Sequence, residues 1–102
     1  MYYVYKHYDI YDNIIYIGIT NDIKRRIIEH ISDEKGHTPI EHKRNICSIE
    51  FATVMNKKEA EFYETYYINS YKPKYKISKN SSNEYITIQL PELNWYKVKL
   101  DK

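Results

Sequence analysis

The sequence predicts an α+β fold, in which a small, mainly antiparallel sheet of three strands is flanked by helices and followed by a short C-terminal β extension. Three observations lead to this prediction. Two runs of β-branched and aromatic residues stand close together near the N-terminus, two later segments have a helical period, and a third strand-like run lies between them. Two strands joined by a short polar connection pair antiparallel, so the sheet begins with a hairpin.

The hairpin is predicted over residues 2–6 and 14–20, which are rich in tyrosine and isoleucine. Asp9, Asp12 and Asn13 lie between the two runs and favour a turn.

Alternation along the second strand assigns its side chains to two faces. Ile15 and Ile17 are expected on one face, and Tyr16 and Gly18 on the other.

Ile23, Ile27 and Ile31 recur every four residues, which predicts an amphipathic helix that ends near Ser32. Thr20 or Asn21 could serve as its N-cap, with Asp22 in the first turn. A second, short helix is predicted to start at Thr38 and Pro39, a favoured order of cap and proline.

Residues 48–55 are predicted to form the third strand. Asn56 can then cap a helix that has Glu59 at the capping-box position and that runs to about Tyr71, before Pro73.

A chain of 102 residues can bury one core but not two. We therefore predict one domain over residues 1–78 and a tail over residues 79–102. In the tail, a polar linker comes first. Polar and apolar residues then alternate over 84–90 and 95–100, which predicts two strands that form a terminal hairpin.

Composition is that of a globular domain, with 42% hydrophobic and 29% charged residues. The net charge of +2 does not by itself indicate a nucleic-acid binder, although basic residues gather at 24–26, 43–44 and 72–79. The single cysteine, Cys47, cannot form an internal disulfide, and residues 1–10 lack a signal-peptide pattern, so a reducing, intracellular (cytoplasmic) setting is expected. No run reaches the roughly 18 apolar residues of a membrane span.

Glu64 carries the strongest physical clue to chemistry. On the last predicted helix it shares one stripe with Ala60, Tyr67, Ile68 and Tyr71. A carboxylate on a core-facing stripe is costly unless it is paired, protonated or bound to a metal. A hydrogen bond to a nearby tyrosine or a salt bridge to an arginine would satisfy it as well as a metal would.

Arg26 and His30 are four residues apart on the first helix and flank one edge of its isoleucine stripe. Arg25 points away from that stripe. Arg26 is therefore the arginine that could face a pocket, although such a pair also fits an ordinary helix edge.

Taken together, these residues resemble the GIY-YIG nuclease family. The resemblance rests on Tyr3-Val4-Tyr5, on Tyr16-Ile17-Gly18, on Arg26 and His30, on 35–40, and on Glu64 with the later 72–75. It covers about residues 1–78. Two positions depart from the family pattern, because Tyr3 replaces the first glycine and Lys76 stands where many members have asparagine.

The resemblance implies a metal-dependent DNA endonuclease that hydrolyses phosphodiester bonds. One divalent cation, Mg²⁺ or Mn²⁺, would be held by Glu64 and by water, and Arg26 would offset charge on the phosphoryl oxygens. Tyr5 or Tyr16 would contact the attacking water, with His30 as proton acceptor. The remaining implied substrate contacts are Gly18, His37 and Lys76.

Two other interpretations remain open at this stage. One is a nuclease-like module that binds nucleic acid or protein without cutting, and the other is a structural protein in which Glu64 is a satisfied core carboxylate. DNA is the expected partner. The tail with Trp95 and Tyr96 could form a homodimer interface, which would allow double-strand cleavage, or it could simply cap the core. The resemblance to phage homing endonucleases also admits a viral or phage source.

Overall fold

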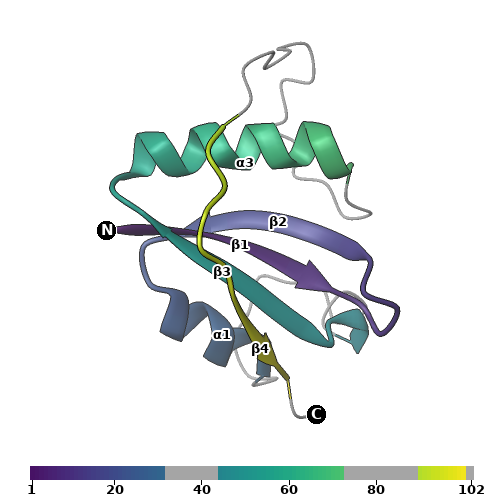
Figure 1. Ribbon diagram of the computed structural model, residues 1–102. Helices are drawn as coiled ribbons and strands as arrows, with labels where there is room; N and C mark the ends of the chain where they lie inside the picture. The colour runs from purple at the N-terminus through teal and green to yellow at the C-terminus, as the bar shows by residue number, and fades with distance from the viewer. Residues whose placement is uncertain (32–43, 73–89, 101–102) are drawn as a thin grey trace.

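The computed structural model describes residues 1–31, 44–72 and 90–100, apart from the side chains of residues 30 and 31. A single sheet separates the two helices, with α3 on one face and α1 on the other (Figure 1). The elements in chain order are β1 (Tyr2–Tyr8), β2 (Ile14–Thr20), α1 (Ile23–Ile31), β3 (Ser48–Val54), α3 (Lys57–Tyr71) and β4 (Tyr96–Lys99). The predicted α+β class is confirmed. The short helix predicted at residues 38 and 39 lies outside the described residues.

The sheet has four strands in the order β2-β1-β3-β4, and every neighbouring pair is antiparallel. The prediction of three strands was therefore wrong by one. Strand β4 pairs with β3, with Phe51 opposite Tyr96, so the C-terminal segment completes the sheet edge. Residues 84–89, in the other arm of the predicted terminal hairpin, lie outside the described residues.

The turn between β1 and β2 is organised by Asp9. Its carboxylate accepts hydrogen bonds from the backbone N–H groups of Tyr11 and Asn13, each at 2.9 Å. Asp12 adopts a left-handed conformation with φ 64°, which aspartate tolerates better than most residues. The predicted turn residues thus close the hairpin as expected.

A bulge in β2 changes which side chains share a face. Tyr16 pairs with His7 and Ile14 pairs with Tyr8, so Ile15 is the extra residue of the bulge. As a result Ile15 packs into the same cluster as Tyr5, whereas Ile17 belongs to the cluster on the α3 side. The prediction that Ile15 and Ile17 share a face was wrong, because strict alternation does not hold across a bulge.

The two faces of the sheet bury different cores. On one face Val4, Ile17 and Val54 pack with the buried residues of α3. On the other face Tyr5 and Ile15 belong to a cluster against which Ile23 and Ile27 of α1 pack. The isoleucine stripe of the first helix and the core-facing stripe of the last helix were therefore identified correctly.

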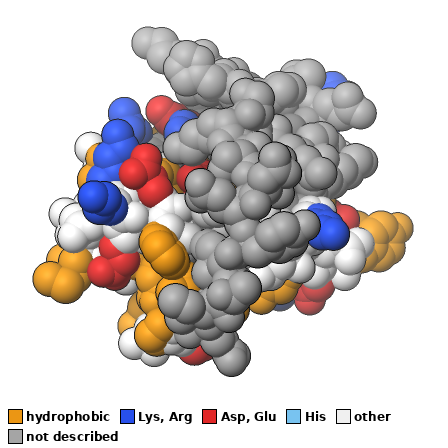
Figure 2. Space-filling view, turned by 90° about the horizontal axis from the view of Figure 1, so that it is seen from above, with side chains coloured by type: hydrophobic (Ala, Val, Ile, Leu, Met, Phe, Trp, Pro, Cys, Tyr) orange, Lys and Arg blue, Asp and Glu red, His pale blue; other side chains and the backbone are white. Residues whose placement is uncertain are grey.

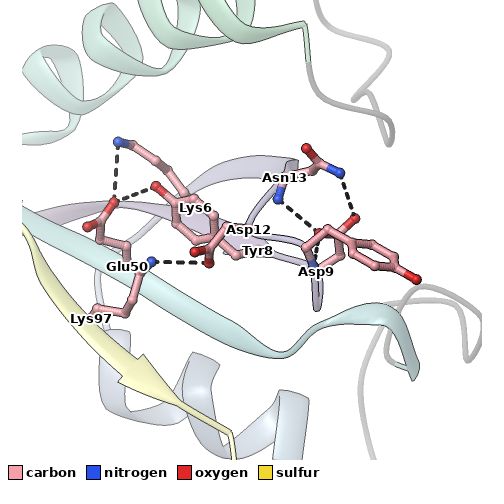
Figure 3. Close-up of polar contacts among 8 residues, drawn as sticks. Lys6, Tyr8, Asp9, Asp12, Asn13, Glu50 and Lys97 are labelled. Atoms are coloured by element: carbon pink, nitrogen blue, oxygen red, sulfur yellow. Dashed lines mark hydrogen bonds and ion pairs between the residues drawn. The ribbon is translucent and has the colours of Figure 1, made fainter.

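Lys6 joins the sheet to the C-terminal segment, although it is a charged residue with 5% exposure. Its ammonium lies 3.4 Å from the carboxylate of Glu50 and 3.8 Å from the centre of the Trp95 ring. The same carboxylate accepts a 2.7 Å hydrogen bond from Tyr8, while Lys97 pairs with Asp12 beside it (Figure 3). Burial lowers the pKa of Lys6, and Glu50 opposes that shift.

Both helices begin at capped positions. Asp22 caps α1 by accepting a hydrogen bond from the backbone N–H of Arg25, so the expectation of Thr20 or Asn21 as cap was wrong. Thr20 instead accepts from the backbone of Asp22. Asn56 caps α3 at Glu59 as predicted. In the described part of the chain, neither helix is long and apolar enough to cross a membrane.

Candidate active site

Gly18 of β2 lies against the side chains of Tyr5 and Tyr16. It lies directly opposite Tyr5 in the β1–β2 pairing. A Cβ atom on Gly18 would lie 2.6 Å from the hydroxyl oxygen of Tyr5 and 2.9 Å from Cε2 of Tyr16. The Tyr5 ring therefore extends across β2, over a strand position that has no side chain. Glycine is required here by close approach and not by backbone conformation.

We expect Gly18→Ala to destabilise the domain by about 1–3 kcal/mol, the usual cost of an overpacked site. The added methyl group would displace both tyrosine rings, so any activity that depends on them should fall further than stability does. Thermal unfolding and activity at a temperature where the variant is folded would measure the two effects. A variant as stable and as active as the wild type would contradict this account of Gly18.

Arg26 reaches the tyrosines from α1. It hydrogen-bonds to the Tyr5 hydroxyl, and its Nη1 forms a 3.1 Å ion pair with Glu29 one turn along the helix. Its side chain is 30% exposed, whereas Arg25 is exposed and turned to solvent. The structure thus places Arg26, and not Arg25, beside the tyrosines, as the helix phase predicted.

Glu64 reaches the same centre from α3, on the other side of the sheet. It is 3% exposed and lies among the buried Ala60, Tyr67 and Ile68 of the predicted stripe. Its charge raises the pKa of Tyr16, which places the two groups within electrostatic range. Strand β2 is an edge strand, so groups from both faces can meet at its border.

The phenols of Tyr5 and Tyr16 differ in how readily they ionise. Burial is the largest cause that raises the pKa of each, and Arg26 lowers both. The hydrogen bond between them raises the pKa of Tyr5 and lowers that of Tyr16. The hydrogen bond therefore disfavours the phenolate of Tyr5 and favours that of Tyr16.

The tyrosines also predict how stability depends on pH. Burial raises the pKa of five of them: Tyr5, Tyr8, Tyr16, Tyr63 and Tyr67. A raised pKa in the folded state gives stability that is fully present below the unfolded value, about 10, and is lost as pH rises above it. The lowered pKa of Lys6 acts in the opposite direction, but it is a single group.

We therefore expect the melting temperature not to fall until about pH 10 and to decrease steeply above that pH. Thermal melts across this range, followed together with near-ultraviolet phenolate absorbance, would show unfolding and ionisation occurring together. A melting temperature that stays flat while the buried phenols ionise would contradict the prediction.

His7 is a site residue that sequence reasoning missed. It is 0% exposed, and its ring lies against those of both Tyr5 and Tyr16. The predicted first strand ended at Lys6, but β1 continues to Tyr8. Extending the alternation from Tyr5 by two residues would have placed His7 on the same face.

Three predicted site residues cannot be placed. His37 and Lys76 lie outside the described residues, as does the side chain of His30. Their roles remain predictions from the family resemblance.

The residues present fit a magnesium ion held by few protein ligands. Within residues 1–31, 44–72 and 90–100, no three His, Cys, Asp or Glu side chains are grouped to hold a metal. Glu64 offers a hard carboxylate oxygen whose charge acts on the phenol of Tyr16, and Mg²⁺ commonly binds through one or two carboxylates while keeping several waters. Glu64 is thus the described residue that could hold such an ion.

Neither positive nor negative charge predominates on the coloured part of the α3 side of the molecule. Basic, acidic and hydrophobic side chains are intermingled on the part of that face that is coloured by type (Figure 2). This agrees with the net charge of only +2.

Comparison with known proteins gives a consistent result. The profile of the GIY-YIG catalytic domain matches residues 1–76. An uncharacterised protein, YurQ of Bacillus subtilis, is 35% identical over 77 residues, which cover 74% of this chain and 60% of YurQ. UvrABC system protein C of Methanococcus maripaludis is 29% identical over 102 residues, and that of Bdellovibrio bacteriovorus is 32% identical over 76. The matches cover 98% and 72% of this chain, but only 19% and 12% of those two relatives.

Proposed function

Because the chain belongs to the GIY-YIG catalytic domain family, whose profile covers residues 1–76, we propose that it is a divalent-metal-dependent DNA endonuclease. Family membership and the similarity to UvrABC system protein C support a nuclease-type function. One observation carries the proposal furthest. Tyr16 is coupled electrostatically to Arg26 of α1 and to Glu64 of α3, and by a hydrogen bond to Tyr5 of β1.

Arg26 supplies the positive charge of the site. Its guanidinium offers five donors in a planar fork that matches phosphate. Some of these donors bond to Tyr5 and Glu29. The Nε atom of Arg26 is buried without a hydrogen-bond partner among the described residues. In the proposed reaction, the guanidinium offsets the charge that develops on the phosphoryl oxygens.

The two tyrosines divide the proton transfer. The hydrogen bond with Tyr5 lowers the pKa of Tyr16, so the Tyr16 oxygen is the one assigned to accept the proton of the attacking water. Tyr5 orients that oxygen and stabilises negative charge on it. As the family resemblance suggests, His30 takes the phenol proton of Tyr16, so that the phenolate oxygen can accept the proton of the attacking water.

Glu64 is the carboxylate that would hold Mg²⁺ or Mn²⁺. When bound, the ion supplies Lewis-acid stabilisation of the leaving oxygen and positive charge close to Tyr16. Without a cation, the charge of Glu64 disfavours the phenolate of Tyr16. The carboxylate therefore links the metal site to the proton acceptor.

Cleavage of supercoiled plasmid tests the proposal. We expect nicking that requires Mg²⁺ or Mn²⁺, stops with chelator and disappears in Arg26→Ala and Glu64→Ala. One centre cuts one strand, so nicked circles should form before linear DNA, and a linear product formed without delay would support a homodimer. Single-stranded and branched DNA should be tested in parallel.

Two outcomes would reject the proposal that the protein is an endonuclease. One is wild-type protein that cuts none of these substrates with either metal. The other is cleavage that persists in both variants, which would indicate a contaminating nuclease. Retained DNA binding without cleavage would instead favour a non-catalytic binding module.

A further inference from the structure

His7 lies at the centre of the tyrosine pair, although it belongs to no motif of the resemblance. It follows Tyr5 by two residues on β1 and is the direct cross-strand partner of Tyr16 on β2. Both relations place its side chain on the face of the sheet that carries the two phenols. It is 0% exposed, so it does not contact substrate from solvent.

The three rings form a compact triangle. The centre of the imidazole lies 5.0 Å from that of Tyr16, at 26°, and 5.2 Å from that of Tyr5, at 33°. The two phenol rings are further apart, at 6.1 Å. Each tyrosine therefore packs more closely on His7 than on the other tyrosine.

Such packing restricts how the phenol of Tyr16 can turn. The Tyr16 hydroxyl is at the end of a long side chain, so a small change in the χ1 angle, which tilts the whole ring, moves the oxygen far. The flat imidazole limits the ring on one side, and Gly18 brings its edge close to the backbone of β2. A displacement of about 1 Å at a reacting group can cost about 100-fold in rate.

We propose that His7 is a positioning residue, whose ring stacks on Tyr16 and holds the phenol in its working orientation. This inference rests on the proposed function, because it assigns His7 a part in the same site. The plain alternative is that His7 only fills volume in the core. The two accounts differ, since positioning requires a planar ring and filling requires only volume.

Replacements of matched kinds separate these accounts. His7→Phe retains a flat ring without nitrogen, and His7→Leu retains apolar volume without a ring. We expect His7→Phe to keep kcat within about threefold of wild type, and His7→Leu to lose about 10- to 100-fold in kcat with little change in KM. A His7→Leu enzyme with wild-type kcat would overturn the proposal, as would His7→Phe falling as low as His7→Leu.

A double-mutant cycle with Tyr16→Phe tests whether His7 affects the rate through Tyr16. If His7 acts through Tyr16, then His7→Leu should cost little more once the hydroxyl of Tyr16 is absent. If His7→Leu lowers kcat by the same factor in the Tyr16→Phe background as in wild type, this route is contradicted. Rates are compared at a temperature where every variant is folded.

A measurement without cleavage separates this inference from the proposed function. In protein with 13C-labelled tyrosine rings, the Tyr16 signals are assigned by their loss in Tyr16→Phe. We expect their shifts to stay near wild type in His7→Phe and to move toward solvent-exposed values in His7→Leu. A wild type that cuts no DNA would reject the nuclease, and unchanged Tyr16 signals in His7→Leu would reject the role of His7.

Discussion

Replacing Glu64 with glutamine should abolish most metal-dependent cleavage, with a loss of about a thousandfold or more in the single-turnover rate. A metal that stabilises the leaving oxygen contributes several kcal/mol, and about 4 kcal/mol corresponds to a factor of about a thousand. Glutamine keeps the shape of the side chain but is a poor ligand for Mg²⁺.

The same variant should remain folded. Glutamine has nearly the same size as glutamate and keeps an oxygen that accepts hydrogen bonds, so the substitution leaves no cavity in the core. Glu61→Gln, three residues earlier on α3, is the matched control and should keep its rate within about threefold. Thermal melts and cleavage at several Mg²⁺ concentrations check both statements. A Glu64→Gln enzyme that reaches the wild-type rate at high Mg²⁺ would show that other groups hold the ion.

Removing the Glu64 charge also changes Tyr16. Glu64 raises the pKa of that phenol, so glutamine should lower it in the absence of metal. An alkaline titration of the Tyr16 ring in the variant should therefore begin at lower pH than in wild type. This readout does not depend on cleavage, and it separates loss of a metal ligand from disorder of the site.

The elements that local patterns control could be predicted. The turn at Asp9, the cap at Asn56 and the three-to-four-residue period of both helices act within a few residues of one another. Helix phase also placed Arg26 on the inner side of α1 and left Arg25 in solvent. The burial of Glu64 follows from the same reasoning on α3.

The features that local patterns do not encode were missed. The bulge at Ile15 places adjacent residues, Ile15 and Tyr16, in the same cluster, and no simple alternation predicts it. Strand β4 joins the sheet through pairing with residues about half a chain away. Lys6 looked like the end of a strand, because its burial depends on Glu50 and Trp95, which are distant in sequence.

That last error explains why His7 was overlooked. A polar residue after a lysine suggests exit to solvent, yet both side chains are buried between partners that only the folded chain brings together. The candidate site therefore contains one group, His7, that a longer first strand would have placed on the face of Tyr5 but that no motif marked as functional. Its ring contacts with Tyr5 and Tyr16 are tertiary facts.

Replacing Arg26 with alanine should lower kcat about 100- to 1000-fold, the usual cost of removing one donor that stabilises charge in the transition state. Arg26→Lys should recover little of it, because an ammonium lacks the planar fork that matches phosphate. Arg25→Ala is the matched control on the same helix. It should change kcat by less than about threefold and weaken DNA binding, with a shallower dependence of affinity on salt because one phosphate contact is lost.

A second effect of Arg26→Ala distinguishes its role at the site from general attraction of DNA. Arg26 lowers the pKa of both Tyr5 and Tyr16, so its removal raises both. If a phenolate accepts the proton from water, the rising limb of the pH–rate profile must move to higher pH in the variant. A profile of unchanged shape, with equal losses in Arg25→Ala and Arg26→Ala that low salt restores, would mean that both arginines only attract the polyanion. A shifted profile seen in Arg26→Ala alone would tie the guanidinium to the tyrosine pair.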